Sequence, residues 1–190
     1  MTPNEREALR RPARFIHANC DQQLAISENI AAHLQILFYR TMTTNNRIVL
    51  SSDHAAIALR QAIATHVVAR GWEAVDIGPT TPESTPYPKH GEAAARLVAS
   101  GDCRFGIILC GTGQGIMMAA NKVKGILCGV CLDTFSARMI RQHNDANMLS
   151  LGARVVGEGL AFDIVDAFLN AQFEGGRHET RVEMIRALEA

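Results

Sequence analysis

The chain has 190 residues and a mass of 20.7 kDa, enough for one domain with a sizeable core and an appendage. Lysine and arginine together number 19, as do aspartate and glutamate, so no net charge favours nucleic acid or an anionic membrane. No apolar run approaches the roughly 20 residues of a membrane span. The five cysteines, odd in number and mostly in apolar surroundings, fit reduced thiols. We therefore expect a cytoplasmic protein that binds neither nucleic acid nor membrane.

Residues 1–46 differ from the remainder, and we expect an N-terminal extension followed by one domain over residues 47–190. Within the extension, apolar residues recur near helical spacing over 24–39. Its acidic residues argue against an organelle transit peptide, and it lacks the apolar core of a secretory signal. Because Met42 stands just before the first predicted strand and reads as an ordinary start, residues 1–41 are expected to be dispensable.

From Arg47 onward, strand-like and helix-like segments alternate. Strands are expected at 48–50, 73–77, 105–110, 126–132 and 148–151. Helices are expected at 55–70, 89–100, 134–142, 160–171 and 179–188, with a further one beginning near 116. Regular alternation predicts an α/β fold, a doubly wound, Rossmann-like five-stranded parallel sheet with helices on both faces. Ligands of such sheets bind beyond the carboxyl ends of the strands, where residues 51–54, 110–115 and Asp133 fall.

A glycine-rich turn follows the central predicted strand, which ends at Cys110. Gly111, Gly113 and Gly115 allow backbone to approach a ligand closely, and the helix start behind them offers free N–H groups and a positive dipole end. A thiol beside such a turn loses its proton easily. The residues alone would place a phosphate or another anion here.

Other interpretations of these residues stay open. The stretch Gly111-Thr-Gly113-Gln-Gly115 is one residue short of the dinucleotide fingerprint, although Asp133 follows about 20 residues later, as a ribose-binding acid would. The turn follows the third predicted strand and not the first, which argues against NAD. Free cysteines are commonly buried, and Cys103, Cys128 and Cys131 are expected to be of that kind. Residues three apart in a strand face opposite sides, so Cys128 and Cys131 should not form a metal or redox pair.

Several polar residues allow both a structural and a functional interpretation. Asp53, directly after the first strand, is either a helix N-cap or a site carboxylate. His143 stands at a helix end, where it would complement the dipole. Arg177, His178 and Arg181 would also fit a solvated helix face. No group of histidine, cysteine and carboxylate residues has metal-ligand spacing, so we expect no metal.

A set of motifs over residues 47–188 resembles the type B ribose-5-phosphate isomerase family, which includes galactose-6-phosphate isomerase subunits and allose-6-phosphate isomerases. In chain order the motifs are Asp53-His54-Ala55, Tyr87-Pro88, Cys110-Gly-Thr-Gly-Gln-Gly115, Ala119-Ala-Asn-Lys122, Arg141-Gln-His-Asn-Asp145, Leu151-Gly-Ala-Arg-Val-Val-Gly157 and Phe173-Glu-Gly-Gly-Arg-His178. The resemblance implies a homodimer or a dimer of dimers, with each active site shared between two subunits. It implies no cofactor.

The resemblance also implies a role for each matching residue. Cys110 would be the base that moves a proton between C1 and C2, and the partner subunit's His143 would assist opening of the furanose ring. Asp53 would lie near the ring oxygen, and Thr112 would contact the reacting end. The turn's amides would hold the enediolate oxygen, in place of the phosphate that the residues alone suggested. The remaining implied contacts are Tyr87, Gly111, Gly113, Gln114, Gly115 and Asn144 for the sugar, and His54, Arg154, Arg177 and Arg181 for the phosphate.

Two positions depart from the family's usual pattern. Ser51 and Ala56 stand where glycine is common, which adds bulk beside the sugar pocket and bears on which sugar is accepted. Some members use a glutamate base just after the glycine turn. This chain has Ile116 there and keeps Cys110, so the cysteine route is expected.

The expected reaction is aldose–ketose isomerisation of ribose 5-phosphate to ribulose 5-phosphate, in pentose phosphate metabolism. It needs a base poised near pH 7, and a thiol with a pKa of about 8.5 needs only modest lowering. Erythrulose 4-phosphate and the 6-phosphates of allose and galactose are alternative substrates. A non-catalytic sugar-phosphate- or nucleotide-binding module is the alternative class. The presence of both Cys110 and His143 argues against that class.

Overall fold

The computed structural model describes residues 45–189, so the helix expected at 24–39 lies outside the described residues. The described part contains a five-stranded sheet in the order β2-β1-β3-β5-β4, and every neighbouring pair is parallel. Its strands are β1 (Arg47–Ser52), β2 (Glu73–Asp76), β3 (Phe105–Cys110), β4 (Cys128–Val130) and β5 (Met148–Gly152). The predicted doubly wound α/β fold is confirmed.

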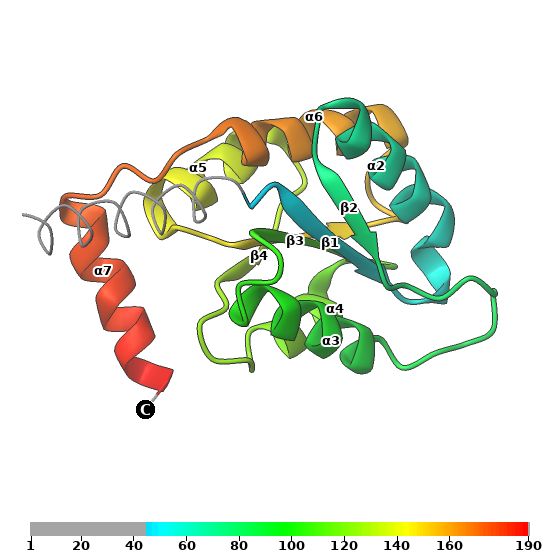
Figure 1. Cartoon of the computed structure of the whole chain (residues 1–190), viewed down its shortest axis with the longest axis horizontal. Coiled ribbons are helices and arrows are strands. Elements are labelled where there is room, and N and C mark those ends of the chain that lie inside the picture. The colour runs from blue at the N-terminus through cyan, green and yellow to red at the C-terminus, as the bar shows by residue number, and fades with distance from the viewer. Residues whose placement is uncertain (1–44, 190) are drawn as a thin grey trace, which may run out of the picture. The chain divides into compact units, whose positions relative to one another are not determined.

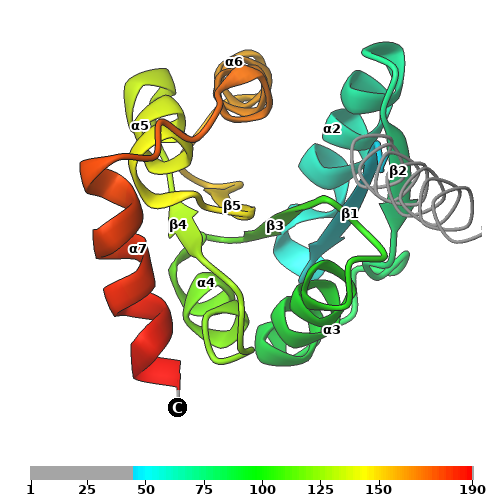
Figure 2. The ribbon, with the colours of Figure 1, turned by 60° about the vertical axis from the view of Figure 1, so that its left-hand side comes forward.

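Helices cover both faces of the sheet, as Figure 1 and Figure 2 show from two sides. The helices on one face are α2 (Ile57–Ala69), α5 (Thr134–Asn144) and α6 (Glu158–Asn170), and those on the other are α3 (Tyr87–Ala99) and α4 (Gln114–Ala120). A further helix, α7 (Arg177–Arg186), stands beside β4 outside these layers (Figure 2). Within residues 45–189, no helix is both long enough and apolar enough to cross a membrane.

Every residue of β3 is buried, because the strand lies at the centre of the sheet and is covered on both faces. Alternate side chains enter two separate cores: Ile107 and Leu109 pack towards α2, α5 and α6, while Ile108 packs towards α3 and α4. Each fully buried aliphatic side chain contributes roughly 1.5–3 kcal/mol. Cys128 lies in the second core and Cys131 in the first. The prediction that these two cysteines face opposite sides of the sheet is confirmed.

Element boundaries differ from the predictions by a few residues. The helix expected from residue 55 starts as a 3-10 turn, η3 (His54–Ala56), because the Asp53 carboxylate accepts the Ala55 N–H at 2.9 Å and caps it. The edge strand β4 is shorter than expected, since among residues 45–189 it pairs only with β5, and only over Cys128–Val130. Helix α7 begins two residues early, directly after Gly176, whose positive φ of 56° turns the chain into it. A short 3-10 turn, η4 (Ala187–Glu189), follows α7.

Candidate active site

The glycine turn at the carboxyl end of β3 encloses the Cys110 thiol. Gly113 adopts a φ of 80°, a left-handed conformation that favours glycine, and its N–H donates to the Cys110 Sγ at 3.1 Å. The Ser150 hydroxyl donates to the Gly113 carbonyl at 2.7 Å and holds the turn against β5. A fixed N–H donor at this distance stabilises negative charge on the sulfur atom. Only 5% of the Cys110 residue is exposed, so the charge would be held in a largely water-free setting.

Two side chains close the rim of this turn. A Cβ atom at Gly115 would lie 2.7 Å from the ring of Tyr87, so only glycine leaves room for that ring. A Cβ at Gly111 would lie 3.4 Å from the guanidinium of Arg154, whose backbone N–H donates to the Gly111 carbonyl at 3.0 Å. Tyr87 and Arg154 therefore stand beside the turn, from α3 and from the loop after β5.

A second group of polar residues gathers where β1 ends. His54 accepts the backbone N–H of Thr85 on Nδ1 at 3.3 Å, which leaves Nε2 to carry the proton of the neutral ring. His90 Nε2 lies 2.9 Å from the Thr85 hydroxyl. Burial lowers the pKa of His90, the charge of Asp53 acts in the opposite direction, and Arg60 lowers it further. Thr85 and His90 were not predicted. His90 stands three residues after Tyr87, on the same face of α3, and that spacing was an available signal.

The buried guanidinium of Arg60 holds the loop that carries Thr85. Its Nη1 donates to the Ser52 hydroxyl at 2.8 Å and its Nη2 to the Pro79 carbonyl at 2.9 Å. Its Nε lies 2.8 Å from an Asp76 carboxylate oxygen, an ion pair by distance that is not aligned as a hydrogen bond. The hydroxyl of Ser51, by contrast, is buried without a partner among residues 45–189.

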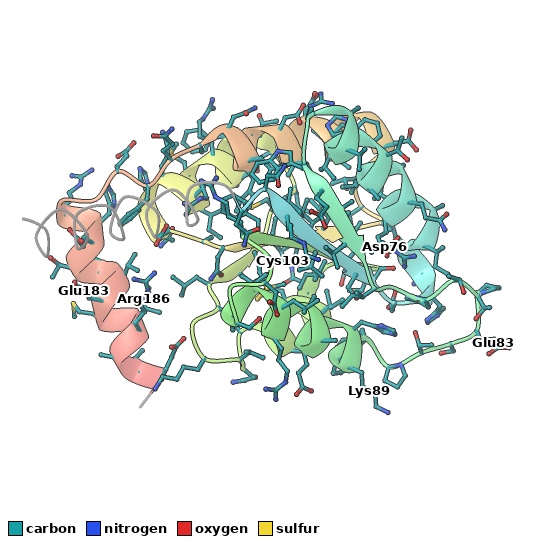
Figure 3. The ribbon with its side chains drawn as sticks, viewed as in Figure 1. Asp76, Glu83, Lys89, Cys103, Glu183 and Arg186 are labelled. Carbon is teal, nitrogen blue, oxygen red and sulfur yellow. The ribbon has the colours of Figure 1, made fainter. Side chains whose placement is uncertain are left out.

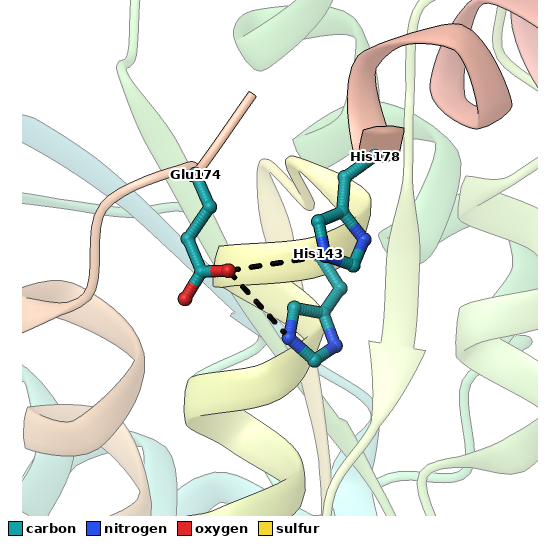
Figure 4. Close-up of side chains that lie close together, drawn as sticks. All are labelled: His143, Glu174 and His178. Atoms are coloured by element: carbon teal, nitrogen blue, oxygen red, sulfur yellow. Dashed lines mark ion pairs between the residues drawn. The ribbon is translucent and has the colours of Figure 1, made fainter. Parts of the chain in front are cut away.

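A third group lies at the junction of α5 and α7. The imidazole rings of His143 and His178 stack at 4.2 Å, nearly parallel. The Glu174 carboxylate faces both rings, 3.9 Å from Nε2 of His143 and 3.8 Å from Nε2 of His178 (Figure 4). Arg177 Nε donates to His178 Nε2 at 3.4 Å. Burial lowers the pKa of His178, and so do the neighbouring charges of His143, Arg177 and Arg181, while Glu174 raises it. Glu174 was not predicted as a site residue, and the solvated face considered for His178 is wrong, because His178 is buried where α7 packs against α5.

Within one chain, this third group lies at the opposite edge of the sheet from Cys110. Helix α5 starts at the carboxyl end of β4 and runs back for 11 residues, about 16 Å, so that its last turn, with His143, reaches the edge where β5 begins. Helix α7 is joined to that end by an ion pair of 3.0 Å between Arg186 and Asp145. Figure 3 shows Arg186 on the far side of the molecule from Asp76, which ends β2.

The structure thus divides the predicted site residues into two sets. The set at the carboxyl edge of the sheet comprises Asp53, His54, Tyr87, Cys110, Gly111, Thr112, Gly113, Gln114, Gly115 and Arg154. The set on the end of α5 and on α7 comprises His143, Asn144, Arg177 and Arg181. The first set contains the Cys110 sulfur and the amides of the glycine turn. The second contains most of the positive charge.

The sheet topology and the thiol-bearing turn at its carboxyl edge define a doubly wound α/β protein, whose candidate site lies at the edge where ligands of such sheets bind. Residues 48–185 match the family model described as Ribose/Galactose Isomerase, and the chain belongs to this family. The resemblance stated from the motifs is therefore confirmed.

Three similar proteins extend this comparison. Ribose-5-phosphate isomerase B of Escherichia coli is 49% identical over 143 residues, which cover 75% of this chain and 96% of that protein. D-erythrulose-4-phosphate isomerase of Pectobacterium atrosepticum is 40% identical, covering 73% and 91%. The structure of Clostridium thermocellum ribose-5-phosphate isomerase B superposes with a TM-score of 0.74 at 51% identity, covering 75% of this chain and 97% of that one.

Proposed function

We propose that this protein is an aldose–ketose isomerase that interconverts ribose 5-phosphate and ribulose 5-phosphate, and that residues 47–190 suffice for the activity. The observation that carries the proposal is the Gly113 N–H at 3.1 Å from the Cys110 Sγ, in a turn whose other amides can face a substrate oxygen. Relatives named ribose-5-phosphate isomerase B, at about half identity, support this choice of substrate.

In the proposed reaction, the Cys110 thiolate removes the proton from the carbon next to the carbonyl group. The electron pair forms a C=C bond, and the carbonyl oxygen becomes the enediolate oxygen. Amides of the glycine turn, together with Thr112, hold that oxygen while its charge develops. The Cys110 thiol then returns the proton to the former carbonyl carbon. The hydroxyl proton of the neighbouring oxygen passes to the enediolate oxygen, so that the new C=O bond forms at the carbon that lost its proton, and no atoms or electrons are gained or lost. Asp53 contacts the sugar near its ring oxygen.

We propose that a second copy of the chain completes each site. His143 would assist ring opening, yet it lies at the opposite edge of its own sheet from Cys110, so it can serve only the Cys110 of another copy. Helix α7 exposes apolar side chains that a second copy would cover: Met184 is 66% exposed, Ile185 41% and, just beyond the helix, Leu188 84%. Such a face suits a homodimer.

The phosphate would be held by residues from both sets. His54 can donate from Nε2, because its Nδ1 already accepts the Thr85 N–H. Arg154 stands beside Gly111 in the same chain, and the partner subunit's Arg177 and Arg181 would supply the remaining charge. Guanidinium groups match a phosphate dianion with charged hydrogen bonds worth roughly 1.5–3 kcal/mol each.

A four-carbon substrate is the second candidate, because the D-erythrulose-4-phosphate isomerase is also 40% identical. Purified protein should be assayed with four-, five- and six-carbon aldose phosphates. We expect the highest kcat/KM for ribose 5-phosphate. A higher kcat/KM for a four- or six-carbon sugar phosphate would make that sugar the assigned substrate. Absence of turnover with all of them would favour a non-catalytic binding module.

A further inference from the structure

The cluster of His143, Glu174 and His178 is also a set of metal ligands. Each side chain offers one ligand atom, and these three atoms lie within 4.8 Å of one another. Sequence spacing predicted no metal site, since Glu174 and His178 belong to a different segment from His143. The fold brings them together where the chain leaving α6 passes the end of α5, and the Glu174 N–H donates to the Gln142 carbonyl at 3.0 Å.

To hold an ion, the three groups must close together and one imidazole must turn out of the stack, because each Nε2 lone pair lies in its ring plane and the two planes are within 3° of parallel. Zn²⁺ binds nitrogen and carboxylate oxygen at about 2.0–2.2 Å, which separates tetrahedral ligand atoms by about 3.3 Å. The Glu174 carboxylate is 3.9 Å and 3.8 Å from the two Nε2 atoms, so its Oε2 must approach by about half an ångström. The Glu174 side chain is 49% exposed and free to adjust. The His143 side chain is 37% exposed, so its ring has room to turn towards an ion that enters from solvent, whereas the His178 ring is buried and stays in place.

The surrounding residues restrict which ion fits. Arg177 already donates to Nε2 of His178, so that nitrogen presents a lone pair, and an ion would displace a weak hydrogen bond of 3.4 Å. Arg177 and Arg181 add positive charge nearby, which repels a cation held by electrostatics alone. Two imidazoles and one carboxylate suit Zn²⁺ and similar transition metals, whereas Mg²⁺ prefers oxygen ligands.

We propose that His143, Glu174 and His178 form a binding site for Zn²⁺ or a similar divalent transition metal, and that occupation of the site inhibits the enzyme. The ion would take the Nε2 lone pair of His143, and with it the group that assists ring opening. A solvent molecule would fill the fourth position. The inhibition, though not the binding, rests on the proposed function.

Binding is tested by titrating the full-length protein with ZnCl₂ in a calorimeter. We expect one Zn²⁺ per chain that is lost or weakened about tenfold or more in both Glu174→Gln and His178→Ala, as removal of a ligand requires. Glu179→Gln is the matched control, because Glu179 is an exposed carboxylate in the first turn of α7 outside the cluster, and it should bind like the wild type. Unchanged zinc affinity in both Glu174→Gln and His178→Ala would show that zinc binds elsewhere or not at all, and would overturn the proposed site.

Inhibition is read separately, as the ratio of activity with and without zinc for each variant. Zinc should inhibit the wild type and Glu179→Gln, MgCl₂ should not, and Glu174→Gln and His178→Ala should require about tenfold more zinc. Because Cys110 is an alternative zinc ligand, calorimetry of Cys110→Ala should still show the wild-type zinc affinity. Loss of zinc binding in Cys110→Ala would assign the ion to the thiol and overturn the proposal. If the protein turned over no sugar phosphate, the proposed function would fail, but the calorimetric test of zinc binding would still apply.

Discussion

The backbone N–H of Gly113 points at the sulfur of Cys110 across 3.1 Å, so that the turn following β3 folds back onto the residue that ends it. This contact requires the left-handed conformation of Gly113 and the buried position of Cys110. It is the structural reason to regard Cys110 as a proton-transferring group, and the first two predictions depend on it.

Replacing Cys110 with alanine should lower turnover by about 10²-fold or more, because a general base is lost. The fold should remain intact, since alanine fits the space of the thiol, and the circular dichroism spectrum should be unchanged. Cys103→Ala removes an equally buried thiol from the same core at the other end of β3 and should keep near-wild-type turnover. Turnover of Cys110→Ala close to that of Cys103→Ala would exclude the assigned role.

Alkylation should select Cys110 among the described cysteines. Burial raises the pKa of Cys103 and of Cys128, and it raises that of Cys131 to about 11. Thiols with raised pKa values stay protonated between pH 7 and 8.5 and react slowly. Iodoacetamide at pH 8 should therefore inactivate the enzyme in step with labelling of the Cys110 peptide, and substrate should protect it. Labelling of Cys131 ahead of Cys110 would contradict this expectation; peptide mapping separates both from Cys20, which lies outside the described residues.

Two inactive variants should complement each other if the site spans two subunits. A chain with Cys110→Ala keeps His143, and a chain with His143→Ala keeps Cys110, so each mixed dimer contains one intact site. Co-expressed chains that mix at random should give about one quarter of the wild-type activity. Purification through two different tags isolates the mixed dimer. Activity of the mixed dimer no higher than that of either variant alone would show that Cys110 and His143 of different chains do not share an active site.

Gly115→Ala should impair catalysis and leave the fold stable. The added methyl group would lie 2.7 Å from the ring of Tyr87, which is too close, so the ring must move. It can do so because Tyr87 is 42% exposed. Displacement at the rim of the site should lower kcat/KM about tenfold or more. Gly159→Ala in α6 is the control, since its methyl group would meet no atom within 4 Å. Equal kinetics for both variants would remove Tyr87 from the site.

Arg60→Met should destabilise the domain by about 3 kcal/mol, because it leaves the Asp76 carboxylate and the Ser52 hydroxyl without their buried partner. The value is at the low end for a broken buried pair, since 32% of the Asp76 side chain is exposed. Arg96→Met, which breaks an exposed ion pair with Glu92, should cost less than about 1 kcal/mol. Urea denaturation measures both, and equal midpoints would show that the Arg60 pair contributes little.

Much of this protein could be predicted from local sequence patterns. Alternating strands and helices implied a doubly wound parallel sheet, because parallel strands need crossovers and helices supply them. The glycine turn after Cys110 could also be predicted, since closely spaced glycines indicate backbone geometry that other residues avoid. The opposite placement of Cys128 and Cys131 followed from the two-residue period of a strand. Each of these inferences needed only neighbours along the chain.

The tertiary structure decided what lies together across long stretches of sequence. His90 reaches the end of β1 only because α3 packs beside that strand, and Arg60 of α2 meets Asp76 only because α2 packs against β2. The meeting of His143, Glu174 and His178 depends on how the chain after α6 crosses the end of α5. The separation of His143 from Cys110 likewise arises because α5 runs antiparallel to the strands. Such distances are set by the packing of whole elements, which no local pattern encodes.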